Sequence, residues 1–436
     1  MKSVKLSGLL VAILFFTANV FALDGNITFD QNGSISKIVT QINAVTSDTE
    51  IVPEALLDDK AEVILPAVGK KALKKWTVMV FVNAKNNLES YGLSDVNEME
   101  MIGSSDKVNI VAELGRLPGY SSADGDWKGS RRYLINKDNN TNAITSPVLM
   151  EIPNSDMGSW EYLVGFTKWS MEKFPAENYM LIVWNHGSGW NKDNMFESSK
   201  GLSYDDVTNN HMTTPQIRMA LEKIGKINIF SMDACLMQMA EVAYEIKDYA
   251  NYVVASEEIE LADGYTYNTF LGPLVSNPNM DGAALSKATV DSFVDHYASI
   301  NRSGTQSAIK TAGFDKFVVL LNDWIQTAMT ANEKEAVVNA KNSAQDFYYS
   351  SNKDIYHFIQ LVAQNAKNEG LIAKSNNILK FMDDKLITYS KATGYNYNNT
   401  YGLAVYMPSY SSSSYGVLKW AADSQWDEFI TWYNKK

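Results

Sequence analysis

The segment INIFSMDACLMQMAEVAYE, residues 227–245, decides the fold expected for this chain. Its first part, INIFSM, is a short apolar run of the kind found in buried strands. The residues after it fall at helical spacing, at Leu236, Met239, Ala240, Ala243 and Ile246. The only cysteine of the chain, Cys235, lies where the expected strand gives way to the expected helix. The segment therefore predicts a strand–turn–helix unit with a thiol at the turn.

A second segment of this kind, NYMLIVWNHGSGW at residues 178–190, predicts a strand that ends in His186. Similar apolar runs occur at 76–84, 108–114 and 252–256, and helical patterns separate them at 87–103, 156–174 and 214–225. Asn87 and Thr214 are the candidate caps of two of these helices. Strands alternating with helices predict right-handed crossovers and a mostly parallel sheet flanked by helices, an α/β fold. Functional residues of such sheets gather at the carboxyl ends of the strands, where His186 and Cys235 fall.

The chain divides into four parts by composition and pattern. Residues 1–22 have the character of a signal peptide, and residues 23–75 are a polar N-terminal extension or a pro-segment, two readings that the pattern leaves open. Residues 76–280 form the expected α/β core. Residues 281–436 are helix-rich, with helical stretches at 282–301, 310–346, 354–367, 370–391 and 425–433 and a returning strand, GLAVYMP, at 402–408.

The N-terminus predicts export. Lys2 and Lys5 precede an apolar run at 9–17, and small residues at 20–22 offer a cleavage site. An uncleaved membrane anchor is the alternative, but the run is short for a bilayer and no later run is longer. We expect a secreted or periplasmic protein without a membrane association after signal removal.

Charge and cysteine content narrow the class of function. The formal net charge of −12 disfavours binding to nucleic acid, which requires clustered lysine and arginine. Cysteines of exported proteins normally pair as disulfides, so the unpaired Cys235 is either an inert buried residue or a working thiol. Its sequence surroundings favour the working thiol.

Cys235 and His186 have the features of a nucleophile and its base. A thiolate is favoured at a helix N-terminus or beside a histidine, and the expected helix after Cys235 supplies the first condition. His186 would accept the thiol proton and return it to the leaving amine. The backbone N–H groups of Gly187 and Cys235 could form an oxyanion hole. The alternatives are a buried cysteine that acts as a small apolar residue and a structural histidine.

Several motifs together resemble the clostripain family of secreted bacterial cysteine peptidases. They are, in order, WTVMVFVNAKNNLE, NYMLIVWNHGSGW, MDACLMQMAEVAYE, VVASEE, GLAVYMP and WDEFI, and they run from Trp76 almost to the C-terminus. The resemblance implies a caspase-like fold, a His186–Cys235 dyad, and cleavage after arginine or lysine. The family usually has aspartates before the asparagines of the first motif, where this chain has Lys85.

A pocket for a basic P1 side chain needs a carboxylate, because a desolvated cation must be paired. The resemblance places the selectivity aspartate at Asp263, and Asp233 could line the same pocket. An ordinary Asp-Gly turn is the alternative for Asp263. A helix N-cap is the alternative for Asp233.

Members of the family also resemble self-processing zymogens that are cut between the histidine and cysteine segments. The corresponding stretch is NKDNMFESSKGLSYDD, residues 191–206, and Lys200-Gly201 is the expected processing site, with Lys192 as a second candidate. An uncut surface loop is the alternative.

We therefore expect a cysteine endopeptidase, made as a zymogen, that acts as a monomer on protein or peptide substrates with arginine or lysine at P1. The alternatives are a catalytically silent binding protein or adhesin and a transpeptidase that uses the same dyad. No organic cofactor and no specific metal site are expected. Calcium occurs in the clostripain type, and Asp205-Asp206 or Asp124 with Asp126 could supply oxygen ligands, although neither pair has EF-hand spacing.

Overall fold

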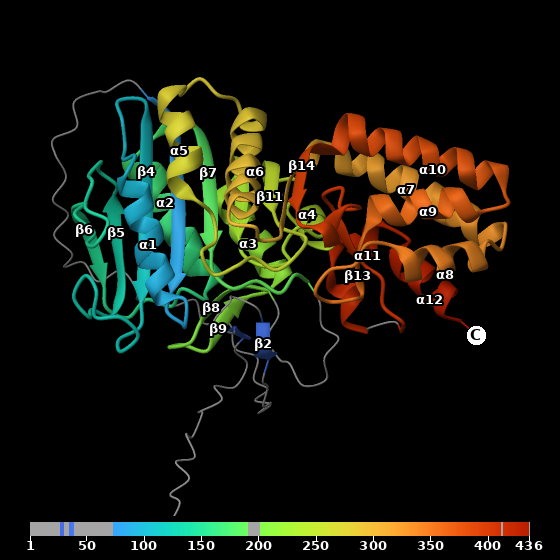
Figure 1. Ribbon diagram of the computed structural model, residues 1–436, viewed down its shortest axis with the longest axis horizontal. Helices are drawn as coiled ribbons and strands as arrows, with labels where there is room; N and C mark the ends of the chain where they lie inside the picture. The colour runs from blue at the N-terminus through green and yellow to red at the C-terminus, as the bar shows by residue number, and fades with distance from the viewer. Residues whose placement is uncertain (1–26, 30–34, 39–72, 191–200, 411–412, 436) are drawn as a thin grey trace, which may run out of the picture.

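The computed structural model describes residues 27–29, 35–38, 73–190, 201–410 and 413–435 (Figure 1). The expected signal peptide, most of the N-terminal extension, and both candidate processing lysines, Lys192 and Lys200, lie outside the described residues. Two short strands of the extension, β1 (Ile27–Phe29) and β2 (Ile35–Ile38), pair antiparallel.

A nine-stranded sheet forms the centre of the molecule, in the order β14-β12-β11-β10-β7-β3-β4-β5-β6. Its five central strands are parallel: β11 (Ala250–Ala255), β10 (Ile227–Asp233), β7 (Ala176–Trp184), β3 (Lys74–Ala84) and β4 (Val108–Arg116). An antiparallel pair closes each edge: β12 (Gly304–Lys310) with β14 (Ile387–Thr393), and β5 (Gly129–Leu134) with β6 (Val148–Ile152). The prediction of a mostly parallel sheet is confirmed.

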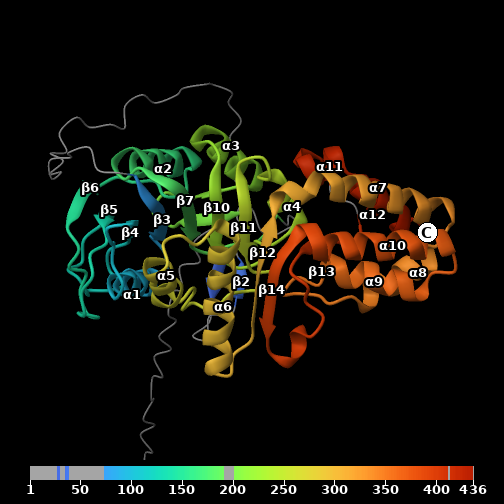
Figure 2. The same ribbon diagram turned by 90° about the horizontal axis from the view of Figure 1, so that it is seen from above.

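Helices cover both faces of this sheet, as Figure 2 shows from above. One face carries α1 (Glu89–Glu100), α5 (Tyr267–Ser276) and α6 (Gly282–Ser299), and the other carries α2 (Trp160–Lys173) and α3 (Thr214–Ile224). Strands covered on both sides need apolar side chains on both sides. This explains the continuous apolar run of β3, whose residues 76–84 are all buried.

The C-terminal part joins the sheet and then extends beyond it. After β12, the helices gather past the β14 edge (Figures 1 and 2). They are α7 (Phe314–Thr330), α8 (Lys334–Ser343), α9 (Ile355–Asn365), α10 (Glu369–Phe381), α11 (Lys419–Asp423) and α12 (Trp426–Asn434). A two-stranded ladder of β13 (Asn352–Asp354) and β15 (Ala404–Tyr406) contains the predicted returning strand. No helix among the described residues is both long and apolar enough to cross a membrane.

Some predicted helices were wrong in extent. The stretch 310–346 is divided into α7 and α8 by a turn in which Asn332 has a φ of 53°. The stretch 370–391 ends in a π-helical turn, and residues 387–393 become β14 instead. Pairing with β12 decides this, because an edge strand gains its hydrogen bonds from its neighbour, whatever its local helical pattern. The strands β5, β6 and β12 were not predicted.

Lys85, at the end of β3, forms a buried ion pair. Its Nζ lies 2.8 Å from Asp205 Oδ2, and the two side chains are 3% and 0% exposed. Asp205 ends β8 (Leu202–Asp205), which pairs with β9 (Asn210–Met212). The lysine that departs from the family pattern therefore fastens this hairpin to the central sheet. It also supplies a counter-ion to one of the aspartates considered for calcium.

We predict that Lys85→Met destabilises the protein strongly. Removing one partner of a buried ion pair leaves an uncompensated charge, at a cost of about 3–5 kcal/mol. Lys75→Met is the matched control on the same strand, because the Lys75–Glu177 pair (2.7 Å) is solvent-accessible and contributes about 0–1 kcal/mol. Urea unfolding followed by circular dichroism measures both, and equal midpoints for the two variants would contradict the prediction.

Candidate active site

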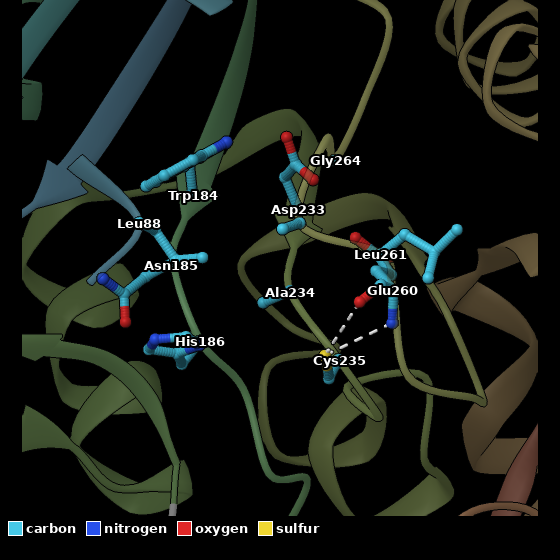
Figure 3. A pocket seen from close by; sticks show the side chains of 11 residues that line it. Leu88, Trp184, Asn185, His186, Asp233, Ala234, Cys235, Glu260, Leu261 and Gly264 are labelled. Atoms are coloured by element: carbon cyan, nitrogen blue, oxygen red, sulfur yellow. Dashed lines mark hydrogen bonds between the residues drawn. The ribbon is translucent and has the colours of Figure 1, made fainter. Parts of the chain in front are cut away.

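The register of two adjacent strands brings His186 and Cys235 together. Trp184 at the end of β7 pairs with Asp233 at the end of β10, and the N–H of Asn185 donates to the Asp233 carbonyl (3.2 Å). His186 lies two residues after Trp184, and Cys235 lies two residues after Asp233, so the two leave the paired strands at the same level. Both line one pocket, shown in Figure 3.

The segment from Asn185 to Gly187, which contains His186, also contacts the strand β8. Asn185 exchanges hydrogen bonds with the backbone of Tyr204, which donates to Oδ1 (2.6 Å) and accepts from Nδ2 (3.2 Å). Gly187 forms an antiparallel bridge with Leu202. The segment from Asn185 to Gly187 is thereby fixed between β10 and β8.

Gly187 lies where only glycine fits. A Cβ at this position would be 2.5 Å from the carbonyl oxygen of Cys235. In its bridge with Leu202 the hydrogen bonds are carried by the flanking residues, Ser188 N to Gly201 O (3.1 Å) and Ser203 N to His186 O (3.3 Å). The N–H of Gly187 consequently points away from Leu202. The absence of a side chain thus lets the main chain at Gly187 pass close to Cys235.

Cys235 does not lie at a helix N-terminus, so the expected dipole effect on its thiol was wrong. The following helix, α4 (Ala240–Glu245), begins only at Ala240, and Leu236 has a φ of 65°. The thiol instead contacts the main chain of Glu260, whose N–H donates to Sγ (3.2 Å) and whose carbonyl accepts from it (3.6 Å). Burial, and secondarily the nearby Glu260 side chain, raises the pKa of this thiol.

His186 is held by a residue that the sequence did not single out for the site. Its Nε2 lies 2.7 Å from Oδ1 of Asn87, and because an amide oxygen only accepts, Nε2 is the donor in this contact. Burial lowers the pKa of His186 to about 3. Asn87 was expected to cap α1, but Leu88 is the N-cap residue and no side chain caps this helix. Asn86 Oδ1 accepts from the N–H of Leu88 (2.9 Å) in the turn before it.

The acidic side of the pocket is built around Asp233. Its Oδ1 accepts from the N–H of Tyr265 (3.1 Å) and its Oδ2 from the hydroxyl of Tyr267 (2.9 Å). No helix begins at Asp233, so the N-cap alternative is wrong. Gly264 has a φ of 57°, and a Cβ there would lie 2.8 Å from Asp233 Oδ1. Glycine is needed here because the turn closes directly over the carboxylate.

Asp263 lies in that turn, which is closed by Gly264 N donating to Leu261 O (2.9 Å). Its side chain is exposed and is not among the residues that line the pocket. Its charge nevertheless raises the pKa values of two other carboxyls, Asp95 and Glu98, although burial is the larger cause for both. The turn alternative is therefore correct as local structure.

Sequence reasoning missed three further carboxyls: Glu260, which lines the pocket, and Asp95 and Glu98 of α1, which do not line it but whose pKa values are raised by burial and by the charge of Asp233. Burial raises the pKa of Asp233 to about 6 and that of Glu98 to about 7. It also raises the pKa of Glu260, as does the neighbouring Asp233. No lysine or arginine is among the described residues that line the pocket.

The aspartates considered for calcium have other partners. Asp124 Oδ1 accepts from Ile144 N (3.2 Å), and Asp126 Oδ1 accepts from Gly119 N (3.1 Å). Burial raises the pKa of Asp206 to about 7. In the described parts of the chain, no group of three or more histidine, cysteine, aspartate or glutamate side chains is arranged to hold a metal ion.

The model of the clostripain family, Peptidase C11, matches residues 80–433. The chain belongs to the clostripain family. Solved members of this family are C11 cysteine proteases. Clostripain from Hathewaya histolytica is 27% identical over 221 residues, which are 46% of this chain and 42% of that protein. The alignment thus spans less than half of the curated relative.

Solved structures of C11 proteases share the fold. An inactive zymogen C11 protease from Parabacteroides distasonis matches with a TM-score of 0.60 and 21% identity, over 82% of this chain and 99% of that chain. A secreted C11 cysteine protease from Bacteroides thetaiotaomicron, in complex with an irreversible peptide inhibitor, matches with a TM-score of 0.58 and 16% identity, over 83% and 98%. The clostripain-family fold therefore extends over both the sheet and the C-terminal helices.

We predict that the thiol of this clostripain-family member is neutral in the described conformation. Burial disfavours both the thiolate and the imidazolium, so the thiol pKa moves up and the histidine pKa moves down. The rate of alkylation by iodoacetamide should rise continuously from about pH 6 to about pH 9, as the thiolate fraction grows. Intact mass reports a single site, because the chain has one cysteine. A plateau near neutral pH would instead indicate a preformed thiolate–imidazolium pair.

Proposed function

We propose that this protein is a secreted cysteine endopeptidase that hydrolyses peptide bonds after arginine or lysine by means of a His186–Cys235 dyad. The observation that carries the proposal is the shared pocket at the carboxyl ends of β7 and β10. A thiol, an imidazole and a buried carboxyl line this pocket. A nucleophile, a proton carrier and a recognition group for a basic side chain are thus within one site.

In the proposed reaction the Cys235 sulfur attacks the scissile carbonyl, and His186 takes the thiol proton. The N–H groups of Gly187 and Cys235 stabilise the oxyanion. His186 then returns the proton to the departing amine, which leaves an acyl-enzyme on Cys235. Water hydrolyses this thioester, with His186 as its base. Transfer of the acyl group to an amine, a transpeptidation, is a variant of the same step that product mass spectrometry with added amine distinguishes.

Asp263 and Asp233 are the proposed partners of the basic P1 side chain. Asp233 lies in the pocket, and Asp263 is the exposed residue between Ala262 and Gly264, which both line the pocket. The described pocket residues include two carboxyls, Asp233 and Glu260, and no lysine or arginine. This supports the assignment, because a cation that enters a dry pocket needs a compensating charge. The same chemistry does not distinguish arginine from lysine.

The described conformation corresponds to a resting state. The thiol is hydrogen-bonded to Glu260 and the imidazole to Asn87, so each partner of the dyad has another contact. Such an arrangement fits a zymogen. It also fits the alternative of a catalytically silent binding protein, in which these contacts would be permanent.

We predict that Cys235→Ala abolishes cleavage of arginyl and lysyl fluorogenic peptides, with a loss of about 10³-fold or more. His186→Ala should lower kcat by about 10²–10⁴-fold, because it removes the general base. His296→Ala, on α6, is the matched control and should retain wild-type rates. Peptides with neutral or acidic P1 residues should be cleaved poorly by the wild type.

Equal rates for Cys235→Ala and the wild type would end the endopeptidase proposal. A wild type that cleaves nothing and fails to react with a lysine-mimetic thiol-directed inhibitor would favour the binding protein.

Self-processing between the histidine and cysteine segments is part of the proposal. Gly201, on the far side of the candidate Lys200–Gly201 bond, is buried, and its N–H donates to Ser188 Oγ (3.1 Å). Cleavage of this bond requires that Gly201 leave Ser188. Lys192 remains the second candidate.

We predict that the purified wild type yields two fragments, one of which begins at Gly201, and that Cys235→Ala stays intact. Lys200→Ala should block this cut and Lys192→Ala should not, because only Lys200 provides the basic P1 residue for it. N-terminal sequencing and intact mass also report signal removal. A new terminus at Asp193 would assign processing to Lys192, and an uncut active wild type would contradict the zymogen proposal.

A further inference from the structure

The sheet order places an asparagine, the histidine and the cysteine after three neighbouring strands. The strand before His186, β7, lies between β10, which precedes Cys235, and β3, which precedes Asn87. Both β3 and β10 pair with β7 as far as Trp184. The histidine segment therefore leaves the sheet between the segment that carries the thiol and the segment that carries Asn87.

Asn87 contacts the imidazole through its side-chain oxygen. Its Oδ1 lies 2.7 Å from Nε2 of His186. An amide oxygen only accepts, so Nε2 carries a proton, and in a neutral imidazole Nδ1 is then the acceptor. Burial lowers the pKa of His186 to about 3, so the ring is neutral at neutral pH. The contact thereby selects one of the two tautomers of the ring.

The turn that carries Asn87 is held on both sides of this residue. Before it, Asn86 donates from Nδ2 to the Tyr204 carbonyl (2.9 Å) and accepts from the N–H of Leu88 (2.9 Å). After it, Leu88 is buried and lines the pocket (Figure 3). An acceptor on a turn that is supported in this way can hold a ring in one orientation.

We propose that Asn87 is a positioning residue that holds His186 as the Nε2–H tautomer, so that Nδ1 takes the proton of the Cys235 thiol. The inference rests on the proposed function and deepens it, because it states which nitrogen of the imidazole exchanges the proton. The contact with Asn87 engages Nε2, so it persists while the proton moves at Nδ1.

The same contact stabilises the charge that the reaction creates. When Nδ1 accepts the thiol proton, the sulfur electron pair attacks the scissile carbonyl carbon and the ring becomes an imidazolium. The N–H at Nε2 then belongs to a cation, and its hydrogen bond to Oδ1 becomes stronger. When Nδ1 returns its proton to the departing amine, the ring is neutral again and the Nε2 proton is unchanged. Because the gain appears only as the proton moves, loss of Oδ1 should lower kcat and leave KM nearly unchanged.

The tautomer can be measured without a substrate. Nitrogen-15 NMR of the ring distinguishes a protonated from an unprotonated nitrogen, and His186 is identified among the four histidines by the signal that His186→Ala loses. At about pH 7 we expect the wild type to carry the proton on Nε2. Asn87→Leu, which has no acceptor, should show a mixture of both tautomers. A proton on Nδ1 in the wild type, or an unchanged tautomer in Asn87→Leu, would overturn the proposal.

Kinetics of folded variants separate positioning from a structural role. Asn87→Leu and Asn87→Ala remove the acceptor, and we expect kcat on arginyl or lysyl peptides to fall about 10- to 100-fold, with KM changed less than about twofold. Asn87→Asp keeps an acceptor oxygen at the same place and should retain kcat within about fivefold.

Asn97→Ala is the matched control. Asn97 is a buried asparagine of α1 whose Nδ2 donates to the Leu93 carbonyl of the same helix (2.7 Å). This variant should retain the wild-type kcat. Circular dichroism reports whether each variant is folded before its kinetics are compared.

The outcomes keep the two proposals apart. Equal kcat values for Asn87→Leu and an active wild type, or no rescue by Asn87→Asp, would exclude the positioning role and leave the endopeptidase proposal intact. A wild type that cleaves none of the peptides would refute the proposed function, and with it the role of Asn87 in catalysis.

Discussion

The hydrogen-bonded register of β7 against β10 is the constraint on which the site depends. Because Trp184 and Asp233 are paired, the residues that follow them leave the sheet at the same level and enter the same pocket. A slip of one residue would shift the strand by about 3.3 Å and turn its side chains to the opposite face. The buried apolar runs of both strands oppose such a slip, since each face packs against its own layer of helices.

Burial determines the chemistry that this register makes available. Thiol, imidazole and carboxyls are all withdrawn from water, so each is driven towards its neutral form. A neutral thiol is a poor nucleophile, and a protonated carboxyl is a poor partner for a cation. The Glu260 main chain contacts the Cys235 thiol through both its N–H and its carbonyl.

The C-terminal part supports the site from outside the sheet. Trp190, the last described residue before the candidate processing segment, packs edge-on against Tyr406 (5.5 Å) and Tyr415 (4.8 Å). Glu241 of α4 accepts from the Tyr415 hydroxyl (2.6 Å) and from the N–H of Tyr406 (2.9 Å). The same two tyrosines thus contact the segment after His186 and the helix after Cys235. This part of the chain contributes to the position of both functional segments.

The sequence by itself determined the alternation of buried strands and helices, and with it the edge of the sheet at which His186 and Cys235 lie. Apolar periodicity encodes burial, and burial of both faces specifies a parallel α/β sheet. Only the tertiary structure decided that residues 387–393 form an edge strand, that Asn87 faces His186, and that the Glu260 main chain contacts the Cys235 thiol. These are contacts between segments far apart in the chain. Local pattern cannot specify them, because they depend on how the strand ends and loops meet in space.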